Sequence, residues 1–221
     1  MDMCRFSDLD DMEYRKVIAA LDRILDQIKI PIASPVEPPP GAPTRPVLTP
    51  EQRQGLMESL RFNQIDARHA TIKTAYAQTC RWLLSKSEYQ DWLDSNKISD
   101  HHGFLWIKGK PATGKSTLMK FIHSHCKKAI KESVIISFFF NARGEILEKS
   151  TLGMYRSLLL QLLEHLPELQ GLFETLGSQA SLFDGCYKWD LETTKSLFRR
   201  AVESLSPVSY THLTLPTNRE V

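Results

Sequence analysis

A glycine-rich run with a distinctive spacing lies near the middle of the chain, at Gly109-Lys110-Pro111-Ala112-Thr113-Gly114-Lys115-Ser116. It fits the pattern G-x-x-x-x-G-K-[ST], in which glycines permit a tight turn and let backbone N–H groups surround a phosphate. Lys115 is expected to reach the β- and γ-phosphates, and the Ser116 hydroxyl to bind Mg²⁺. The sequence therefore predicts a binding site for ATP or GTP with Mg²⁺, formed by Gly109 through Thr117.

The residues on either side of this loop are typical of a strand and a helix. Residues 103–107 are apolar throughout, as in a strand buried on both faces of a parallel sheet. Residues 115–131 have helical periodicity and would add the amides and positive dipole end of a helix N-terminus. A lysine-rich turn without a ligand is the alternative, and the strand-loop-helix order disfavours it.

Hydrolysis requires an acidic residue at the end of a second buried strand, to hold Mg²⁺ and polarise water. The apolar run 134–140 ends at Asn141, Glu164 and Glu174 lie in leucine-rich helical segments, and Asp184 precedes a glycine. We therefore expect the acidic strand to lie beyond this sequence, which leaves it uncertain whether the chain is an enzyme.

Residues outside the loop are weaker candidates for binding a ligand or a metal ion. Arg143 could contact a phosphate or a neighbouring subunit, although an exposed loop arginine is the simpler interpretation. The pair His101-His102 has no cysteine or acid nearby at metal-binding spacing. Four cysteines far apart in sequence indicate reduced, buried thiols.

The chain divides by composition into five segments. Residues 8–28 have helical periodicity, so 1–30 is expected to be the stub of an N-terminal effector region. Eight of the twelve prolines fall in 31–50, which predicts an extended linker. A helical leader over 51–102 and a partial nucleotide-binding domain over 103–206 follow, and 207–221 forms a tail.

Helix signals recur through the last two large segments. Thr49-Pro50-Glu51 has the capping residue, proline and acid that begin a helix. Periodicity then predicts helices over 64–85, 87–94, 115–131, 151–166 and 191–205, with a buried strand at 134–140. The expected fold class is α/β, with the first strands of a parallel P-loop NTPase sheet preceded by a helical leader.

The tail contains the peptide VSYTHLTLPT at 208–217. This peptide corresponds, residue for residue, to one reading frame of a common transposase sequencing adapter. We therefore interpret 207–221 as an assembly artefact and exclude it from the fold.

Composition limits the class of protein. The chain has 221 residues, 42% apolar and 24% charged, and its net charge of +2 does not favour binding to nucleic acid. No apolar run approaches the roughly 18 residues of a membrane span, and no signal peptide opens the chain. These features predict a cytoplasmic protein.

The ordered blocks TCRWLL (79–84), YQDWL (89–93), GFLWIKGKPATGKSTLMKFI (103–122) and FFFNARGEILEKSTLGMYRSLLLQLL (138–163) resemble the NACHT-type NTPase region of fungal NOD-like receptors. They are also similar to the N-terminal region of nephrocystin-like proteins. The resemblance implies a signal-transducing ATPase of the STAND type, in which nucleotide exchange switches a closed monomer to a homo-oligomer during non-self recognition. Gly109, Gly114, Lys115 and Ser116 match its phosphate-binding loop.

Two other functions remain open at this point. A small P-loop kinase would also contain the loop, although the long helical leader argues against it. A binding module could hold a nucleotide only for its structure.

Overall fold

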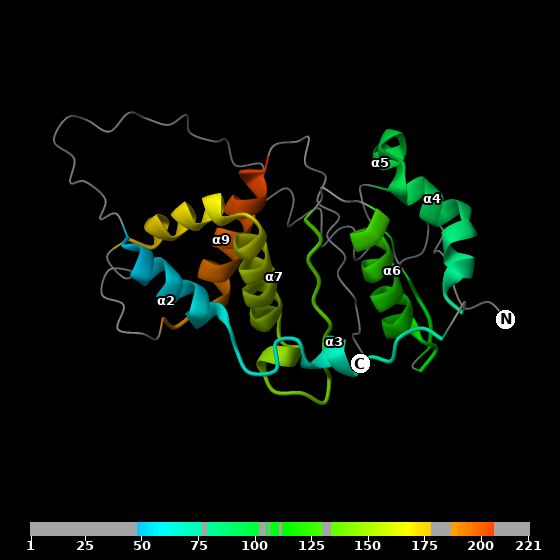
Figure 1. Ribbon diagram of the computed structural model, residues 1–221, viewed down its shortest axis with the longest axis horizontal. Coiled ribbons are helices and arrows are strands. Elements are labelled where there is room, and N and C mark those ends of the chain that lie inside the picture. Colours follow the sequence, from blue (N-terminus) through cyan, green and yellow to red (C-terminus); the bar gives the residue numbers. More distant parts are fainter. Residues whose placement is uncertain are drawn as a thin grey trace. The chain divides into compact units, whose positions relative to one another are not determined.

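The computed structural model describes residues 48–76, 79–101, 105, 107–110, 112–129, 134–177 and 187–205. The backbone forms two compact units, Met1–Thr44 with Trp106–Thr113, and Arg45–Leu105 with Gly114–Val221. All the helices named below belong to the second unit (Figure 1). The expected helix at 8–28, the proline-rich linker up to residue 47 and the tail lie outside the described residues. The linker prediction is wrong at its end, because Thr49 caps the first described helix and Pro50 begins it.

The first described helix, α2 (Pro50–Leu60), begins as its sequence predicts. The Thr49 hydroxyl accepts a hydrogen bond from the Gln52 N–H at 3.2 Å, and the Gln52 side chain accepts one from the Thr49 N–H at 2.9 Å. This reciprocal pair is a capping box, and Pro50 at the first helical position lacks an N–H that would need a partner. The expectation of a helix beginning at Thr49-Pro50-Glu51 is confirmed.

The prediction of one long helix over 64–85 is wrong. The chain forms a five-residue helix α3 (Ala67–Thr71), residues 73–76 are not helical, and a 3-10 helix η1 (Arg81–Ser85) lies further along. Ile72 follows α3 with extended backbone angles. The β-branched residues between Thr71 and Thr74 restrict side-chain rotation in a helix, and this lowers the helix propensity where the prediction fails.

Short helices follow in α4 (Ser87–Leu93), η2 (Ser95–Lys97) and α5 (Ile98–His101). The prediction of a helix at 87–94 is confirmed by α4, which buries Tyr89 and Trp92. Tyr89 joins α4 to α6 (Lys115–Ala129), because its hydroxyl lies 3.8 Å from the Cys126 sulfur. Cys126 completes a buried stripe on α6 with Leu118 and Ile122, one residue per turn.

The centre of the main core is α7 (Thr151–His165), which packs against α2, η4 (Pro167–Leu176) and α9 (Leu191–Glu203). Predicted helices at 151–166 and 191–205 are therefore confirmed. In Figure 1 the α7 ribbon stands beside α9, with the short 3-10 helix η3 (Leu147–Lys149) before its first turn. The buried members of this core include Leu56, Leu60, Phe138, Leu158, Leu162, Phe173, Trp189, Leu197 and Ala201.

Arg156 fixes α7 to the end of α2. Its guanidinium donates hydrogen bonds to the carbonyls of Ser59 at 2.7 Å, Leu60 at 3.2 Å and Arg61 at 2.9 Å. These carbonyls belong to the last turn of α2 and the residue after it, where intrahelical donors run out and a cation is favoured by the helix dipole.

The expected α/β fold with a parallel sheet is contradicted by the described part of the chain, which is helical and contains no strand. The segment 134–140 is extended and largely buried, but only Ser137 makes an isolated β-bridge. The side chain of Gln161 accepts a hydrogen bond from the Ser137 N–H at 3.1 Å and donates one to the Ser137 carbonyl at 2.9 Å. A helix side chain thus satisfies backbone groups that a neighbouring strand would satisfy in a sheet.

None of the helices in the described ranges is long and apolar enough to cross a membrane.

Candidate functional site

The glycine-rich loop leads directly into α6. Two residues of the loop have positive φ, Ala112 at 63° and Gly114 at 87°, and α6 begins at Lys115 as predicted. Positive φ is uncommon for a residue with a Cβ, so the conformation of Ala112 is strained. Left-handed residues in a turn let successive N–H groups converge on one point, which forms an anion-binding concavity.

Hydrogen bonds within the loop hold this turn. The Thr113 hydroxyl donates to the Lys110 carbonyl at 2.8 Å, and the Thr113 N–H approaches the same oxygen at 3.4 Å. The Leu118 N–H donates to the Gly114 carbonyl at 2.9 Å, which is the first intrahelical bond of α6. The Thr113 side chain therefore braces the loop.

Gly114 is needed for its conformation. A Cβ built on Gly114 would meet no atom within 4 Å, so space alone does not exclude a side chain. Its φ of 87° disfavours any other residue, because residues with a Cβ rarely adopt that backbone angle.

The remaining predicted site residues lie along the same continuous stretch. Gly109 and Lys110 are exposed, whereas Lys115, Ser116 and Thr117 in the first turn of α6 are half-buried. Pro111 lies outside the described residues. A helix N-terminus carries a partial positive charge and favours anions.

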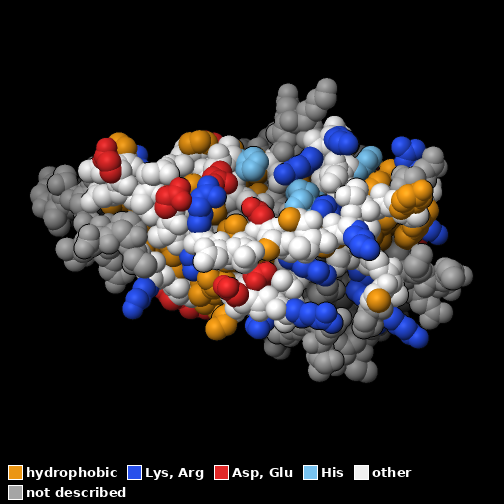
Figure 2. Space-filling view, turned by 60° about the horizontal axis from the view of Figure 1, so that its bottom comes forward, with side chains coloured by type: hydrophobic (Ala, Val, Ile, Leu, Met, Phe, Trp, Pro, Cys, Tyr) orange, Lys and Arg blue, Asp and Glu red, His pale blue; other side chains and the backbone are white. Residues whose placement is uncertain are grey.

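The sequence around the loop carries lysines and no carboxylate. No Asp or Glu occurs between Asp100 and Glu132, whereas that stretch carries the lysines of the loop and of α6. On the face drawn in Figure 2, Lys and Arg side chains are scattered among polar and apolar side chains, and most Asp and Glu side chains lie toward the other end of the view.

Two of the acidic residues that the sequence analysis considered as Mg²⁺ ligands form ion pairs with arginines. Glu164 pairs with Arg61, and Glu174 pairs with Arg53 at 2.7 Å. Asp184 lies outside the described residues. Among those that are described, no group of three His, Cys, Asp or Glu side chains could hold a metal ion.

Sequence analysis missed Glu148, a buried acid between 134–140 and α7. Its carboxylate accepts hydrogen bonds from the Asn141 side chain at 2.8 Å and from the Glu145 N–H at 2.7 Å. The Asn141 bond, followed by the Glu145 bond, holds the pKa of this carboxyl below its usual value. Glu148 thus closes the turn that carries the exposed Arg143.

Lys120 was also missed, because its partners lie about fifty residues earlier. Its ammonium donates to the carbonyls of His69 at 2.7 Å and Ile72 at 2.8 Å, at the end of α3. The His69 ring lies 5.6 Å from the ring of His123 on α6. Helical periodicity in α6 places Lys120 opposite the Leu118–Ile122 stripe but could not identify this contact.

Comparison with known proteins identifies relatives of this region. The family model described as "Nephrocystin 3, N-terminal" matches residues 78–212, a range that contains the whole glycine-rich loop. The chain is 29% identical over 103 residues to vegetative incompatibility protein HET-E-1 of Podospora anserina. That alignment covers 47% of this chain but 7% of the relative, so the chain spans a small part of its length. No solved structure matches.

Proposed function

Because this chain belongs to the nephrocystin 3 N-terminal family, with a NACHT-like NTPase region, we propose that it binds a nucleoside triphosphate through Gly109–Thr117. Backbone N–H groups of the loop hold the β-phosphate, and Lys115 contacts the β- and γ-phosphates. Bound Mg²⁺ would neutralise phosphate charge, and Ser116 would be its protein ligand.

One observation carries this proposal. Positive φ angles at Ala112 and Gly114 turn the chain immediately before the first residue of α6. Positive φ in a turn is a backbone conformation in which N–H groups can surround an anion, and a helix N-terminus, which also favours anions, follows it in sequence. The surrounding stretch without acids supports an anionic ligand.

The biological role proposed is that of a nucleotide-gated switch in fungal non-self recognition. This role is inferred from HET-E-1, whose name describes vegetative incompatibility. Nucleotide-dependent assembly of a homo-oligomer, and action in the cytoplasm, belong to the same proposal.

Titration of Mg²⁺·ATP and Mg²⁺·GTP into the full chain tests the site. Lys115→Ala removes a charge-assisted contact to phosphate, so Kd should rise at least tenfold, about 1.4 kcal/mol. Lys86→Ala is the matched control, because Lys86 is an exposed lysine outside the loop. Equal affinities for the wild-type and Lys115→Ala chains would contradict the proposal.

A further inference from the structure

Thr113 of the glycine-rich loop directs two donors at a single carbonyl. Its hydroxyl donates a hydrogen bond to the Lys110 carbonyl at 2.8 Å, and its N–H approaches the same oxygen at 3.4 Å. Hydrogen bonds from a backbone N–H to an oxygen usually span about 2.7–3.2 Å, so the second contact is long and weak. The hydroxyl is therefore the main donor to this carbonyl, and the N–H is held only loosely.

A second threonine in the chain makes the same pair of contacts with a different balance. The N–H and the hydroxyl of Thr79 both donate to the Tyr76 carbonyl, again three residues earlier in the chain, at 2.9 and 3.0 Å. There the N–H makes a bond of normal length, and the hydroxyl adds to it. In the glycine-rich loop the order is reversed, because the hydroxyl makes the shorter bond and the N–H the longer one.

This difference affects how readily the Thr113 N–H can bind a ligand. An N–H with a good acceptor must give up that bond before it can donate to a phosphate oxygen, whereas a contact of 3.4 Å costs little to give up. The Lys110 carbonyl keeps its bond from the Thr113 hydroxyl during this exchange, so it is not left without a donor. Thr113 also lies between Ala112 and Gly114, which both have positive φ, a conformation in which successive N–H groups can surround an anion.

We propose that Thr113 is a positioning residue for nucleotide binding. Its hydroxyl occupies the Lys110 carbonyl and thereby leaves the Thr113 N–H to donate to a phosphate oxygen of the bound triphosphate. This role depends on the proposed function, because it concerns the same bound phosphates. Serine offers the same hydroxyl donor, whereas valine has the shape of threonine without the hydroxyl. The residue before Gly114 therefore affects how tightly the loop holds phosphate.

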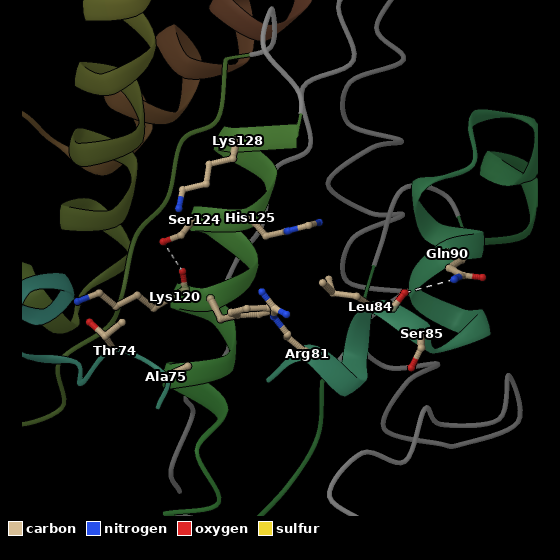
Figure 3. A pocket seen from close by; sticks show the side chains of 11 residues that line it. Thr74, Ala75, Arg81, Leu84, Ser85, Gln90, Lys120, Ser124, His125 and Lys128 are labelled. Carbon is tan, nitrogen blue, oxygen red and sulfur yellow. Dashed lines mark hydrogen bonds between the residues drawn. The ribbon is translucent and has the colours of Figure 1, made fainter. Parts of the chain in front are cut away.

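Among the described residues, the cations that line a groove along the body of α6 do not converge on one point. Figure 3 shows Lys120 and Lys128 extending away from Arg81. The Lys120 ammonium is also bonded to two carbonyls at the end of α3, at 2.7 and 2.8 Å. The groove therefore has no fixed cluster of charge for a phosphate, and a change in nucleotide affinity on substitution within the loop is assigned to the loop itself.

Calorimetric titration of Mg²⁺·ATP into the full chain compares the wild type with Thr113→Val and Thr113→Ser. Thr113→Val should raise Kd about fivefold, the equivalent of roughly 1 kcal/mol for one hydrogen bond. Thr113→Ser should stay within twofold of the wild type, because it restores the hydroxyl donor. Thr79→Val is the matched control, since it removes the same kind of hydroxyl contact outside the loop and should leave Kd unchanged. Melting temperatures of the four chains should agree.

Wild-type affinity in Thr113→Val would overturn this role, as would a loss of equal size in Thr113→Ser or in Thr79→Val. A melting temperature of Thr113→Val well below that of the wild type would also overturn it, because the hydroxyl would then act on the stability of the fold. Lys115→Ala, measured in parallel, separates this role from the proposed function. If Lys115→Ala binds weakly while Thr113→Val binds normally, only the role of Thr113 fails. If the wild type does not bind, or Lys115→Ala binds as tightly as the wild type, both fail.

Discussion

At the scale of single residues, the sequence predicts conformations that depend on neighbouring residues and misses contacts between residues far apart in the chain. The turn from Ala112 to Gly114 and the first residue of α6 follow from the glycine-rich pattern, because both depend on neighbours in the chain. Contacts of Lys120 and Arg156 join residues about 50 and 95 positions apart, and no periodicity encodes them. Side chains that cap a distant helix are therefore visible only in the structure.

His123 provides a prediction at this scale. Burial, with Lys127 and His69 nearby, lowers its pKa to about 4, and burial with Lys120 lowers the pKa of His69, which Asp66 partly opposes. Both Nε2 atoms are buried without a hydrogen-bond partner in the described chain. The folded state thus favours neutral rings, whereas the unfolded state binds protons below about pH 6.5.

Stability should therefore be full above pH 6.5 and fall as the pH drops toward 4. The shift at His123 should lower the free energy of unfolding at pH 5 by roughly 1 kcal/mol, a value halved because the ring is partly exposed to solvent. This loss corresponds to a fall of about 2–4 °C in Tm. Melting at pH 7.5 and 5.0 should show this fall in the wild-type chain and a clearly smaller one in His123→Phe. Carboxyls titrate mainly below this window, so an unchanged fall in the variant would refute the assignment to His123.

At the scale of elements, helices were predicted better than extended segments. The capping residues Thr49, Ser150 and Asp190 each accept a bond from their own helix, so each helix start is encoded within four residues. A strand needs a partner elsewhere in the chain, and hydrophobicity at 134–140 does not specify one. Gln161 of α7 supplies hydrogen bonds to the N–H and the carbonyl of Ser137, in addition to the isolated bridge there.

Gln161 therefore determines a second prediction. Gln161→Leu would leave the N–H and carbonyl of part-buried Ser137 without these bonds, at a cost of roughly 2–4 kcal/mol in the free energy of unfolding. Gln161→Glu keeps an acceptor for the N–H but loses the donor, so its loss should be intermediate. Denaturant unfolding measures both, with Gln54→Leu on the exposed surface of α2 as the control. Equal stability of Gln161→Leu and the control would exclude this role.

At the scale of the whole molecule, the family was recognisable from ordered sequence blocks although the expected fold class was not observed. The blocks around the loop and around 138–163 lie within the family match at 78–212. The division of the chain into two units that separate Thr113 from Gly114 has no signal in composition, because it cuts through a single motif. Spatial grouping of distant segments is a property of packing, and sequence patterns of this length do not encode it.

The last prediction concerns catalysis and depends on how carboxylates are used across the chain. In-line attack on a γ-phosphate requires a carboxylate that can position Mg²⁺, together with a group that orients water. Glu164 and Glu174 are held by arginines, and Glu148 is occupied by the turn it closes. Releasing any of them would break a contact that stabilises the fold, so none is available without a cost in stability.

We therefore expect this chain to bind Mg²⁺·ATP and to hydrolyse it at a rate indistinguishable from that of Lys115→Ala. A phosphate-release assay on the purified chain compares the two under identical conditions. Steady release above the Lys115→Ala background would contradict the prediction and implicate a carboxylate other than Glu148, Glu164 and Glu174. Asp184→Asn would then separate that residue from the paired acids, since Glu164→Gln and Glu174→Gln should alter stability and leave turnover unchanged.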